Sequence, residues 1–322
     1  MKKNLLLLMS ALFLIFLVAC NNEKGSDKAE TTDKEVSNEE TQDEATSDTD
    51  ETKIFTTDSG DEVEIPANPK KIVVLHPAYV GALIKFGHNP VGVPYYVDQD
   101  EVLNEATEGI ERIDPEDVEG IINLEPDLII ATATEPNLNK FQQIAPTVTF
   151  DAMISTYKDN TRLLGELVGE EEQAQAWLEE WEGKMAEDAK KYADLIEGKT
   201  LSIFQSTPKG LISFNTDYGR GGEILYDGYG FVQPDTLAEI TKDQFNVELS
   251  TEELPEYVGD FIVLATIGDE GAPVTETKVW ENADAVQAGR VIELDLSVTR
   301  YNDPISLEFQ RKLIKEQLDA MD

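Results

Sequence analysis

The single cysteine of this 322-residue chain, Cys20, stands where an apolar run gives way to a polar one. The chain begins Met-Lys-Lys and then runs almost unbroken through hydrophobic residues from 5 to 18. A basic start, a short apolar core and small residues before the cleavage site are typical of a secretory signal peptide. The run of about fourteen residues is shorter than the roughly 20 that span a bilayer, which favours a cleaved signal over an uncleaved membrane anchor.

The end of this run gives the cysteine a specific chemistry. Leu17-Val18-Ala19-Cys20 resembles a bacterial lipobox, in which the cysteine thiol is lipidated and becomes the new N-terminus. The resemblance implies that residues 1–19 are a lipoprotein signal peptide. It also implies that Cys20 anchors the mature chain in the lipid bilayer, at the extracellular face of the cell membrane. An acylated cysteine leaves no thiol for a disulfide or a zinc-thiolate site.

Other residue types that catalysis needs are sparse. No Gly-x-Ser-x-Gly elbow occurs, and no His–Asp pair stands out as the partner of a nucleophile. His76 and His88 are the two histidines, which makes a poor zinc site, although carboxylates could hold a harder divalent ion. We therefore expect a binding protein and not an enzyme. A secreted lipid-anchored hydrolase and a direct metal-ion binder are the alternatives from other classes.

The charge of the chain excludes one class of partner. The sequence has 65 Asp and Glu against 26 Lys and Arg, a net charge of −39. Such an acidic surface repels phosphate backbones, so we expect no nucleic-acid partner. Between Asn21 and Lys53 there is almost no large apolar side chain, and such a stretch cannot offset its ordering entropy. Residues 20–53 are therefore predicted to be a disordered acidic tether.

From Ile54 onward, short apolar strands alternate with helical patterns. This rhythm predicts an α/β fold with mostly parallel sheets whose faces are covered. A helix is predicted from 79 to 86. The predicted strands are residues 71–75, 91–93, 128–131, 147–150, 201–204, 211–214, 261–264 and 291–294.

One longer helical segment divides the strands into two sets. Its apolar residues recur at spacings of three and four, which places a continuous stripe on one face. A helix from Glu170 to Glu197 would be about 40 Å long at 1.5 Å per residue. We therefore predict two ligand-binding lobes, residues 54–168 and 199–322, joined by a bridging helix over 169–198.

Two segments that precede strands echo each other. Glu119 stands eight residues before Asp127, and Glu252 stands eight residues before Asp260. In both segments apolar residues follow the glutamate at plus two and plus five, and a turn-former precedes the aspartate. The echo indicates two similar halves. The alternative is that any βα protein repeats helix–turn–strand units.

With these features the chain resembles a substrate-binding lipoprotein of an ABC importer from a Gram-positive bacterium, of the iron-siderophore type with two lobes joined by a helix. Order and spacing of the motifs match over the chain outside the acidic tether. The resemblance implies a monomeric receptor that binds a ferric siderophore, has no cofactor, and delivers its ligand to a membrane permease with a cytoplasmic ATPase. The matching motifs are the lipobox, residues 69–74, 119–127, the bridging helix, 218–226, 252–260 and 302–308.

The resemblance assigns a docking role to two glutamates. In the family, one glutamate on the outer surface of each lobe pairs with arginines of the permease. Glu119 and Glu252 occupy the matching positions here. Two exposed carboxylates at a fixed separation would set register and orientation on basic pockets. A glutamate on the solvated face of a helix is the alternative for each.

In the second lobe, Tyr218 and Arg220 match the family loop that places an aromatic residue and an arginine in the cleft. An arginine donates in a planar fork to the oxygens that ligate iron, and the flanking glycines allow a sharp turn. Arg300 and Tyr301 stand where this lobe would reach the same cleft. A surface salt bridge is the alternative for Arg220.

In the first lobe, the candidates follow predicted strands. His76 and Tyr79 come after the first strand, and Tyr95 and Tyr96 come after the second. Ligands of open α/β sheets lie at the carboxyl ends of strands. A pair of tyrosines could wrap an apolar siderophore and cap its carbonyl oxygens. Core packing is the alternative for each of these residues.

Charge also narrows the choice of ligand. Catecholate siderophores and ferric citrate carry several negative charges and need clustered Arg or Lys, whereas the candidates here include only Arg220 and Arg300. A neutral or cationic ferric hydroxamate fits this set, and the chain most resembles the hydroxamate-binding branch. Haem, which takes an axial His, Met or Tyr, a catecholate siderophore, ferric citrate and cobalamin are the alternatives. The siderophore would hold the iron, so no metal site on the protein is predicted. The stiff bridging helix predicts small lobe motions.

Overall fold

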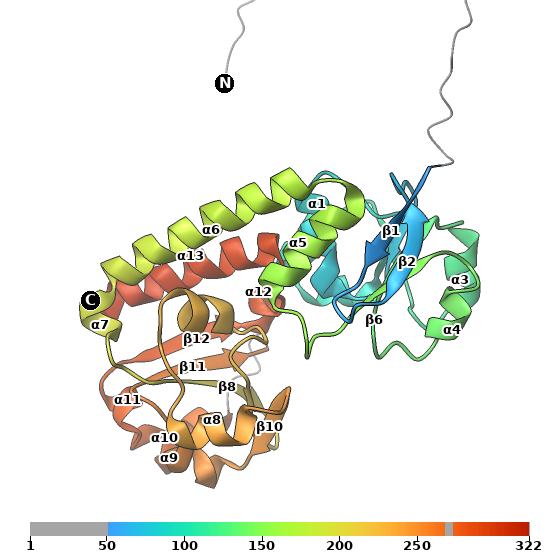
Figure 1. The fold of residues 1–322 in the computed structure, drawn as a ribbon. Coiled ribbons are helices and arrows are strands. Elements are labelled where there is room, and N and C mark those ends of the chain that lie inside the picture. The colour runs from blue at the N-terminus through green and yellow to red at the C-terminus, as the bar shows by residue number, and fades with distance from the viewer. Residues whose placement is uncertain (1–50, 268–272, 322) are drawn as a thin grey trace, which may run out of the picture. The chain divides into compact units, whose positions relative to one another are not determined.

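The computed structural model describes residues 51–267 and 273–321, which form two lobes and a layer of helices (Figure 1). The predicted signal peptide, Cys20 and residues 20–50 of the predicted tether lie outside the described residues. Strand β1 begins at Thr52, so the folded part starts two residues before the predicted start of the first lobe at residue 54. Within the described ranges, no helix is both long and apolar enough to cross a membrane.

The first lobe is built on a five-stranded sheet in the order β5-β4-β3-β6-β7, with all strands parallel. Strands β1 and β2 form a separate antiparallel hairpin. The bounds are β1 Thr52–Thr56, β2 Glu62–Pro66, β3 Ile72–Val74, 3₁₀ helix η1 Pro77–Tyr79, α1 Val80–Lys85, β4 Gly92–Pro94, η2 Tyr95–Gln99, α2 Glu101–Ala106, β5 Glu111–Ile113, α3 Val118–Asn123, β6 Leu128–Thr132, α4 Leu138–Phe141 and β7 Thr147–Phe150.

The second lobe has a mixed five-stranded sheet in the order β10-β9-β8-β11-β12. Strands β8, β11 and β12 are parallel, whereas β9 and β10 run antiparallel to their neighbours. The bounds are β8 Leu201–Thr207, β9 Gly210–Phe214, π-helix η3 Glu223–Gly228, α8 Asp235–Thr241, β10 Asn246–Leu249, η4 Thr251–Glu253, α9 Leu254–Tyr257, β11 Phe261–Thr266, η6 Pro273–Glu276, α10 Lys278–Glu281, α11 Asp284–Gln287, β12 Val291–Asp295, α12 Leu296–Thr299 and α13 Pro304–Met321.

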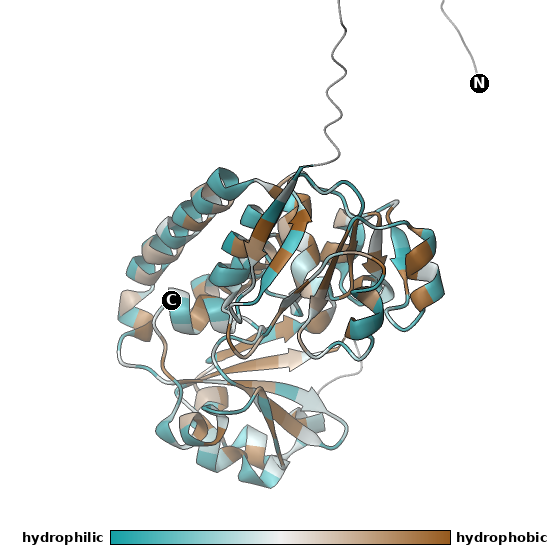
Figure 2. Cartoon of the chain, turned by 45° about the vertical axis from the view of Figure 1, so that its right-hand side comes forward, coloured by the Kyte–Doolittle hydropathy of each residue, from teal (hydrophilic) through white to brown (hydrophobic). Residues whose placement is uncertain are grey.

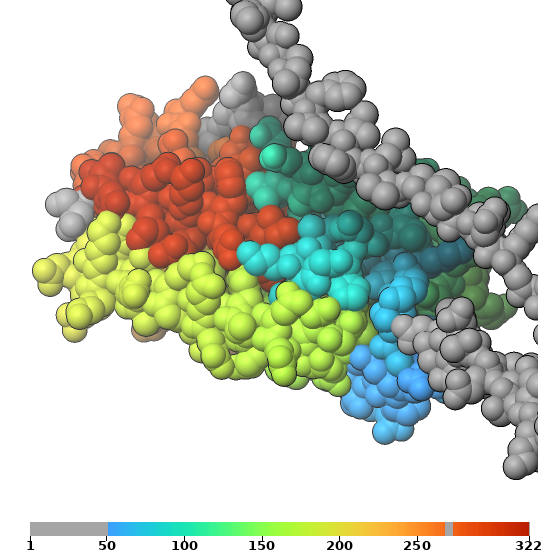
Figure 3. Space-filling view, turned by 90° about the horizontal axis from the view of Figure 1, so that it is seen from above, coloured from blue at the N-terminus to red at the C-terminus, as the bar shows by residue number. Residues whose placement is uncertain are grey.

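The helical layer between the lobes consists of α5 (Tyr157–Val168), α6 (Glu171–Lys191), α7 (Ala193–Ile196) and α13. Helices α6 and α13 run side by side (Figures 1 and 3). The predicted bridging helix is therefore shorter than expected, because it ends at Lys191. At that end the hydroxyl of Tyr192 bonds the carbonyl of Lys315 at 3.3 Å, so a contact with α13 fixes the end of the helix.

A buried ion cluster ties α6 to α13. Asp188, 3% exposed, accepts hydrogen bonds from Nε of Arg311 at 2.6 Å and from the hydroxyl of Tyr229 at 2.9 Å. It also pairs with Lys315. Burial alone would raise the pKa of Asp188, but the bonds from Arg311, Lys315 and Tyr229 outweigh it and hold that pKa below its usual value. The two helices are thus joined by charged contacts to a buried carboxylate.

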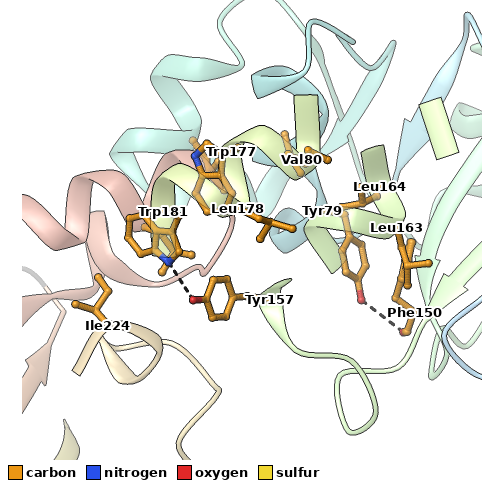
Figure 4. Packing of buried hydrophobic residues seen from close by; sticks show 14 of the residues in the cluster. Tyr79, Val80, Phe150, Tyr157, Leu163, Leu164, Trp177, Leu178, Trp181 and Ile224 are labelled. Carbon is orange, nitrogen blue, oxygen red and sulfur yellow. Dashed lines mark hydrogen bonds between the residues drawn. The ribbon is translucent and has the colours of Figure 1, made fainter. Parts of the chain in front are cut away.

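One hydrophobic core runs from the first lobe through the helical layer into the second lobe. Figure 4 shows part of this core, from Phe150 of the first lobe through Trp177 and Trp181 of α6 to Ile224. Trp181 is fully buried and donates from Nε1 to the hydroxyl of Tyr157 at 2.9 Å. In Figure 2 the strands are predominantly hydrophobic, whereas the outer helices are largely hydrophilic. The continuous core makes the two lobes one folding unit.

The echoed segments have the same structural role in the two lobes. Asp127 accepts hydrogen bonds from the backbone N–H groups of Lys70 and Lys71 at 2.7 and 2.9 Å. Asp260 accepts from the N–H and hydroxyl of Thr200 at 3.0 and 3.1 Å. Each aspartate precedes one strand and holds the chain just before the neighbouring strand. We call these two contacts the aspartate clamps.

Candidate functional site

A cavity of about 330 Å³ lies between the two lobes and takes its lining from both. From the first lobe it is lined by residues after β3, at the end of β6 and after β7. From the second lobe it is lined by the loop after β9 and the segment after α12. The predicted residues that the structure brings to this cavity are His76, Tyr79, Tyr218, Arg220, Arg300 and Tyr301.

The first-lobe wall is aromatic and uncharged. Nδ1 of His76 accepts a hydrogen bond from the N–H of Ala78 at 3.3 Å, which assigns the ring proton to Nε2. Burial lowers the pKa of His76 to about 4, so the ring is neutral at physiological pH. The ring lies 5.5 Å from that of Tyr79 and 6.5 Å from that of Tyr301, between centroids. Burial also raises the pKa of Tyr79, so its hydroxyl stays protonated.

The arginine of the second lobe sits in a strained turn. Gly219, Arg220 and Gly221 have φ values of 79°, 56° and 81°, three successive residues in the left-handed region. Glycine adopts this region freely, but for other residues it costs about 1–2 kcal/mol. At Gly222 an added Cβ would lie 2.3 Å from the carbonyl oxygen of Thr216. The predicted sharp turn is confirmed, and it is tight enough to demand glycine.

The guanidinium of Arg220 is fixed by its neighbours. Its Nε and Nη2 donate to Oε1 of Gln205 at 3.2 and 2.9 Å, and its Nη1 donates to the carbonyl of Tyr218 at 3.0 Å. Its central carbon lies 3.9 Å from the ring centroid of Phe214. An arginine has five N–H donors, so one N–H on each terminal nitrogen is left to meet a ligand. Burial, and then the charge of Arg300, lower the pKa of Arg220 to about 10, which leaves it protonated at neutral pH.

The cavity carries little positive charge. Its lining contains Arg220, Arg300 and the carboxyl of Asp217, and no lysine is among these described residues. Nε of Arg300 is buried and has no hydrogen-bond partner within the described part of the chain. Burial raises the pKa of Tyr301 to about 12, so its hydroxyl is a neutral donor and acceptor. In the same described ranges, no group of three His, Cys, Asp or Glu side chains could hold a metal ion.

Next to the cavity residue Tyr218, the two lobes touch through side chains. The hydroxyl of Tyr218 lies 3.3 Å from Sδ of Met153, which belongs to the loop after β7. The ring of Tyr218 also lies 4.6 Å, between centroids, from that of Phe245, which lines the cavity. Met153 is 55% exposed. The contact between the lobes at Tyr218 is therefore largely apolar.

The tyrosine pair predicted from the second strand lies elsewhere. Tyr95 and Tyr96 begin the 3₁₀ helix η2, with ring centroids 4.1 Å apart, and neither lines the cavity. Tyr95 is 42% exposed, so it is not a core residue. Contact of this pair with a ligand stays a prediction.

Several residues that line the cavity are not among the predicted site residues, and Asp217, Phe245 and Asn302 are three of them. Asp217 and Asn302 adjoin the residues that carried the prediction, so proximity in sequence was an available signal. Phe245 lies between a helix and a strand with no motif around it. Only the packing of β9 against β10 brings it to the cavity.

Both predicted docking glutamates are exposed. Glu119 lies in the first turn of α3, and Glu252 lies in the short helix η4 that leads into α9. Helices α3 and α9 lie at the outer ends of their lobes (Figure 1). Each glutamate therefore presents its carboxylate on a different lobe.

Comparison with known proteins fits this geometry. A family model described as periplasmic binding protein matches residues 72–297. The iron(3+)-hydroxamate-binding protein FhuD of Bacillus subtilis is 36% identical over 280 residues, which cover 83% of this chain and 87% of that protein.

Solved structures give the same result. The FhuD protein of S. pseudintermedius superposes with a TM-score of 0.80 at 35% identity, covering 83% of this chain and 98% of that chain. The structure of FhuD2 from Staphylococcus aureus with bound ferrioxamine B superposes with a TM-score of 0.75 at 35% identity, covering 79% of this chain and 99% of that one. The chain belongs to the periplasmic binding protein family.

Proposed function

We propose that the protein is a lipid-anchored extracellular receptor that binds a ferric siderophore of the hydroxamate class between its two lobes and delivers it to an ABC permease. The observation that carries this proposal is the interlobe cavity with its fixed guanidinium. Arg220 has two N–H groups left after its contacts with the protein, and they match the paired oxygens of an iron complex. The relatives named for hydroxamate binding support the same class.

The charge and apolarity of the cavity select among siderophores. Two arginines and one carboxyl give little net charge, which disfavours ferric citrate and catecholates with several negative charges. The neutral rings of His76, Tyr79 and Tyr301 and the apolar ring of Phe245 suit the aliphatic arms of a hydroxamate. The siderophore keeps the iron, so the protein binds and presents its cargo without reacting with it.

Fluorescence titration with ferrioxamine B tests the proposal. We expect saturable quenching without turnover, and a dissociation constant raised about 10- to 100-fold in Arg220→Ala, because a charge-assisted hydrogen bond contributes roughly 1.5–3 kcal/mol. Arg162→Ala is the matched control, because Arg162 pairs with Asp159 on α5 and does not line the cavity. A melting temperature that ignores ferric hydroxamates but rises with a free divalent metal would point to a metal-ion binder instead.

Anchoring and docking are the second part of the proposal. Cys20→Ala should release the protein into the medium with ligand binding intact and uptake reduced, because anchoring raises its concentration near the permease. Glu119→Lys combined with Glu252→Lys should preserve the affinity for ferrioxamine B and lower iron uptake. Glu172→Lys with Glu187→Lys, two exposed residues of α6, is the control. Equal uptake by both double variants would exclude the docking role.

A further inference from the structure

A buried carboxyl lies behind the loop that carries Arg220. Glu223 is 0% exposed and is the first residue of the π-helix η3. It does not line the cavity, so it makes no ligand contact of its own. A fully buried carboxyl is costly to desolvate, and insertions of the π-helical type are frequent at functional sites. The position of Glu223 therefore needs an explanation beyond packing.

One oxygen of Glu223 joins two separate segments of the cavity wall. Its Oε1 accepts hydrogen bonds from the N–H of Gly219 at 2.8 Å and from Nδ2 of Asn302 at 2.7 Å. Gly219 and Asn302 both line the cavity. A Cβ added at Gly219 would lie 3.0 Å from the carbonyl oxygen of Arg300, so the two segments are already in close contact there. Glu223 is the acceptor that fastens this contact from behind.

The second carboxylate oxygen of Glu223, Oε2, bears on whether this side chain acts through its charge or through the geometry of its hydrogen bonds. Oε2 is buried and has no hydrogen-bond partner within the described residues. Burial raises the pKa of Glu223, which favours the uncharged form, and the neighbouring charge of Asp217 acts in the same direction. The charge of Glu223 acts to raise the pKa of Arg220, but no hydrogen bond or ion pair joins the two side chains within the described residues. The specific contacts of the side chain are thus the two that Oε1 makes.

We propose that Glu223 is a positioning residue of the ligand site, which holds the left-handed turn of Arg220 against the Arg300–Asn302 segment. Backbone in sparsely populated regions costs about 1–3 kcal/mol and persists only where surrounding contacts enforce it. The bond from Glu223 to Gly219 enforces the first residue of this turn. Through it, Glu223 aims the two unpaired N–H groups of Arg220 at the ligand. The inference rests on the proposed function, namely that the cavity binds a ferric hydroxamate.

Three substitutions of Glu223 separate the effect of side-chain length from the effect of its charge, with ferrioxamine B as the ligand probe. Glu223→Gln keeps a carbonyl acceptor at the same reach, and we expect its dissociation constant to stay within about threefold of the wild type. Glu223→Asp keeps the charge but is one carbon shorter, and Glu223→Met keeps the length but has no acceptor. Both should weaken binding about tenfold, which corresponds to about 1.4 kcal/mol. Wild-type affinity in Glu223→Asp with weakened binding in Glu223→Gln would overturn the proposal.

A double-mutant cycle distinguishes positioning from general stability. If Glu223 acts through Arg220, Glu223→Asp should lose most of its effect on the dissociation constant in an Arg220→Ala background. If Glu223→Asp raises the dissociation constant by the same factor in both backgrounds, the inference is wrong. Circular dichroism and the melting temperature monitor folding, and Glu223→Asp carries the test if Glu223→Met does not fold. If the wild type does not bind ferrioxamine B, the proposed function is wrong. If the wild type binds ferrioxamine B no better than Glu223→Asp does, only the role of Glu223 is wrong.

Discussion

At the scale of single residues, His76 makes the free energy of unfolding depend on pH. Burial lowers its pKa from 6.5 to about 4, so the folded state holds the ring neutral where the unfolded chain would protonate it. The stabilisation from the neutral ring is present above pH 6.5 and is lost as the pH falls from 6.5 towards 4. Asp303 opposes this trend, because burial raises its pKa to about 6 and its folded form gains a proton in the same range.

The contribution of His76 can be isolated by comparing His76→Gln with the wild type. A pKa shift from 6.5 to about 4 corresponds to about 3 kcal/mol of unfolding free energy. We expect the wild type to lose up to that amount relative to His76→Gln between pH 7 and pH 4, measured by urea unfolding at each pH. Asp303 is common to both proteins and cancels in the difference. Parallel stability curves over this range would contradict a buried neutral histidine.

Sequence motifs predicted part of the site, and residues outside these motifs were missed. The glycines around Arg220 predicted a turn, and an arginine in such a turn can donate hydrogen bonds to the oxygens of a ligand. Phe245 gave no such signal, because its place at the cavity depends on how the strands β9 and β10 pack. Glu223 gave none either, since a glutamate after a glycine pair looks like any other in so acidic a chain.

At the scale of secondary-structure elements, α1 and α13 meet at a glycine. A Cβ added at Gly81 would lie 1.7 Å from Oδ1 of Asp303, which accepts hydrogen bonds from the N–H groups of Ile305 and Ser306 at the start of α13. The first-lobe helix α1 thus packs directly on the capped start of the C-terminal helix. There is no room between them for a methyl group.

Two glycine substitutions test this contact. Gly81→Ala should lower the free energy of unfolding by about 3 kcal/mol, because overpacking costs roughly 1–3 kcal/mol and the buried cap of α13 is also displaced. Gly183→Ala, in the middle of α6 with open space around it, should raise the free energy of unfolding by about 1 kcal/mol through helix propensity. Urea unfolding of both variants provides the measurement. Equal stability of the two would mean that α1 and α13 do not pack this closely.

The ion cluster between α6 and α13 makes a second prediction. Asp188→Ala should lower the free energy of unfolding by about 3–5 kcal/mol, because it leaves Arg311, Lys315 and Tyr229 without their buried acceptor. Glu180→Ala removes an exposed ion pair with Lys184 on the same helix and should leave the urea midpoint unchanged. A small effect of Asp188→Ala would show that this ion cluster contributes little to the contact between the helices.

Elements with continuous apolar runs were predictable, and elements with mixed sequences were not. Each of the eight predicted strands is present, within one to three residues at its ends. The strands β1, β2, β5 and β10 were missed because charged and polar residues interrupt them, as in Glu62–Pro66. The end of α6 depends on the contact of Tyr192 with α13, and no local sequence signal encodes it.

At the scale of the whole molecule, the continuous core and the paired helices α6 and α13 limit how the lobes can move. Both helices cross from one lobe to the other and share the Asp188 cluster (Figure 3). Helix α13 also contacts α1 and α2 of the first lobe. Opening the lobes widely would have to break this core, so ligand binding should involve small adjustments.

Distance measurements between spin labels test this rigidity. Labels at Glu105→Cys on α2 and Glu239→Cys on α8, with Cys20→Ala to remove the native thiol, report the separation of the lobes. We expect ferrioxamine B to shift the mean distance by about 2 Å or less, as in pre-organised complexes. The Arg220→Ala variant with the same labels is the control for specific binding. A shift several times larger would contradict the rigid junction.

The aspartate clamps have an evolutionary consequence. Asp127 and Asp260 hold the starts of neighbouring strands in the two lobes, and neither residue lines the cavity. Substitutions that alter the cavity wall therefore leave both clamps intact. The residues that stabilise the sheets differ from the residues that select the cargo. Such a scaffold can exchange one cargo for another by drift in a few loops.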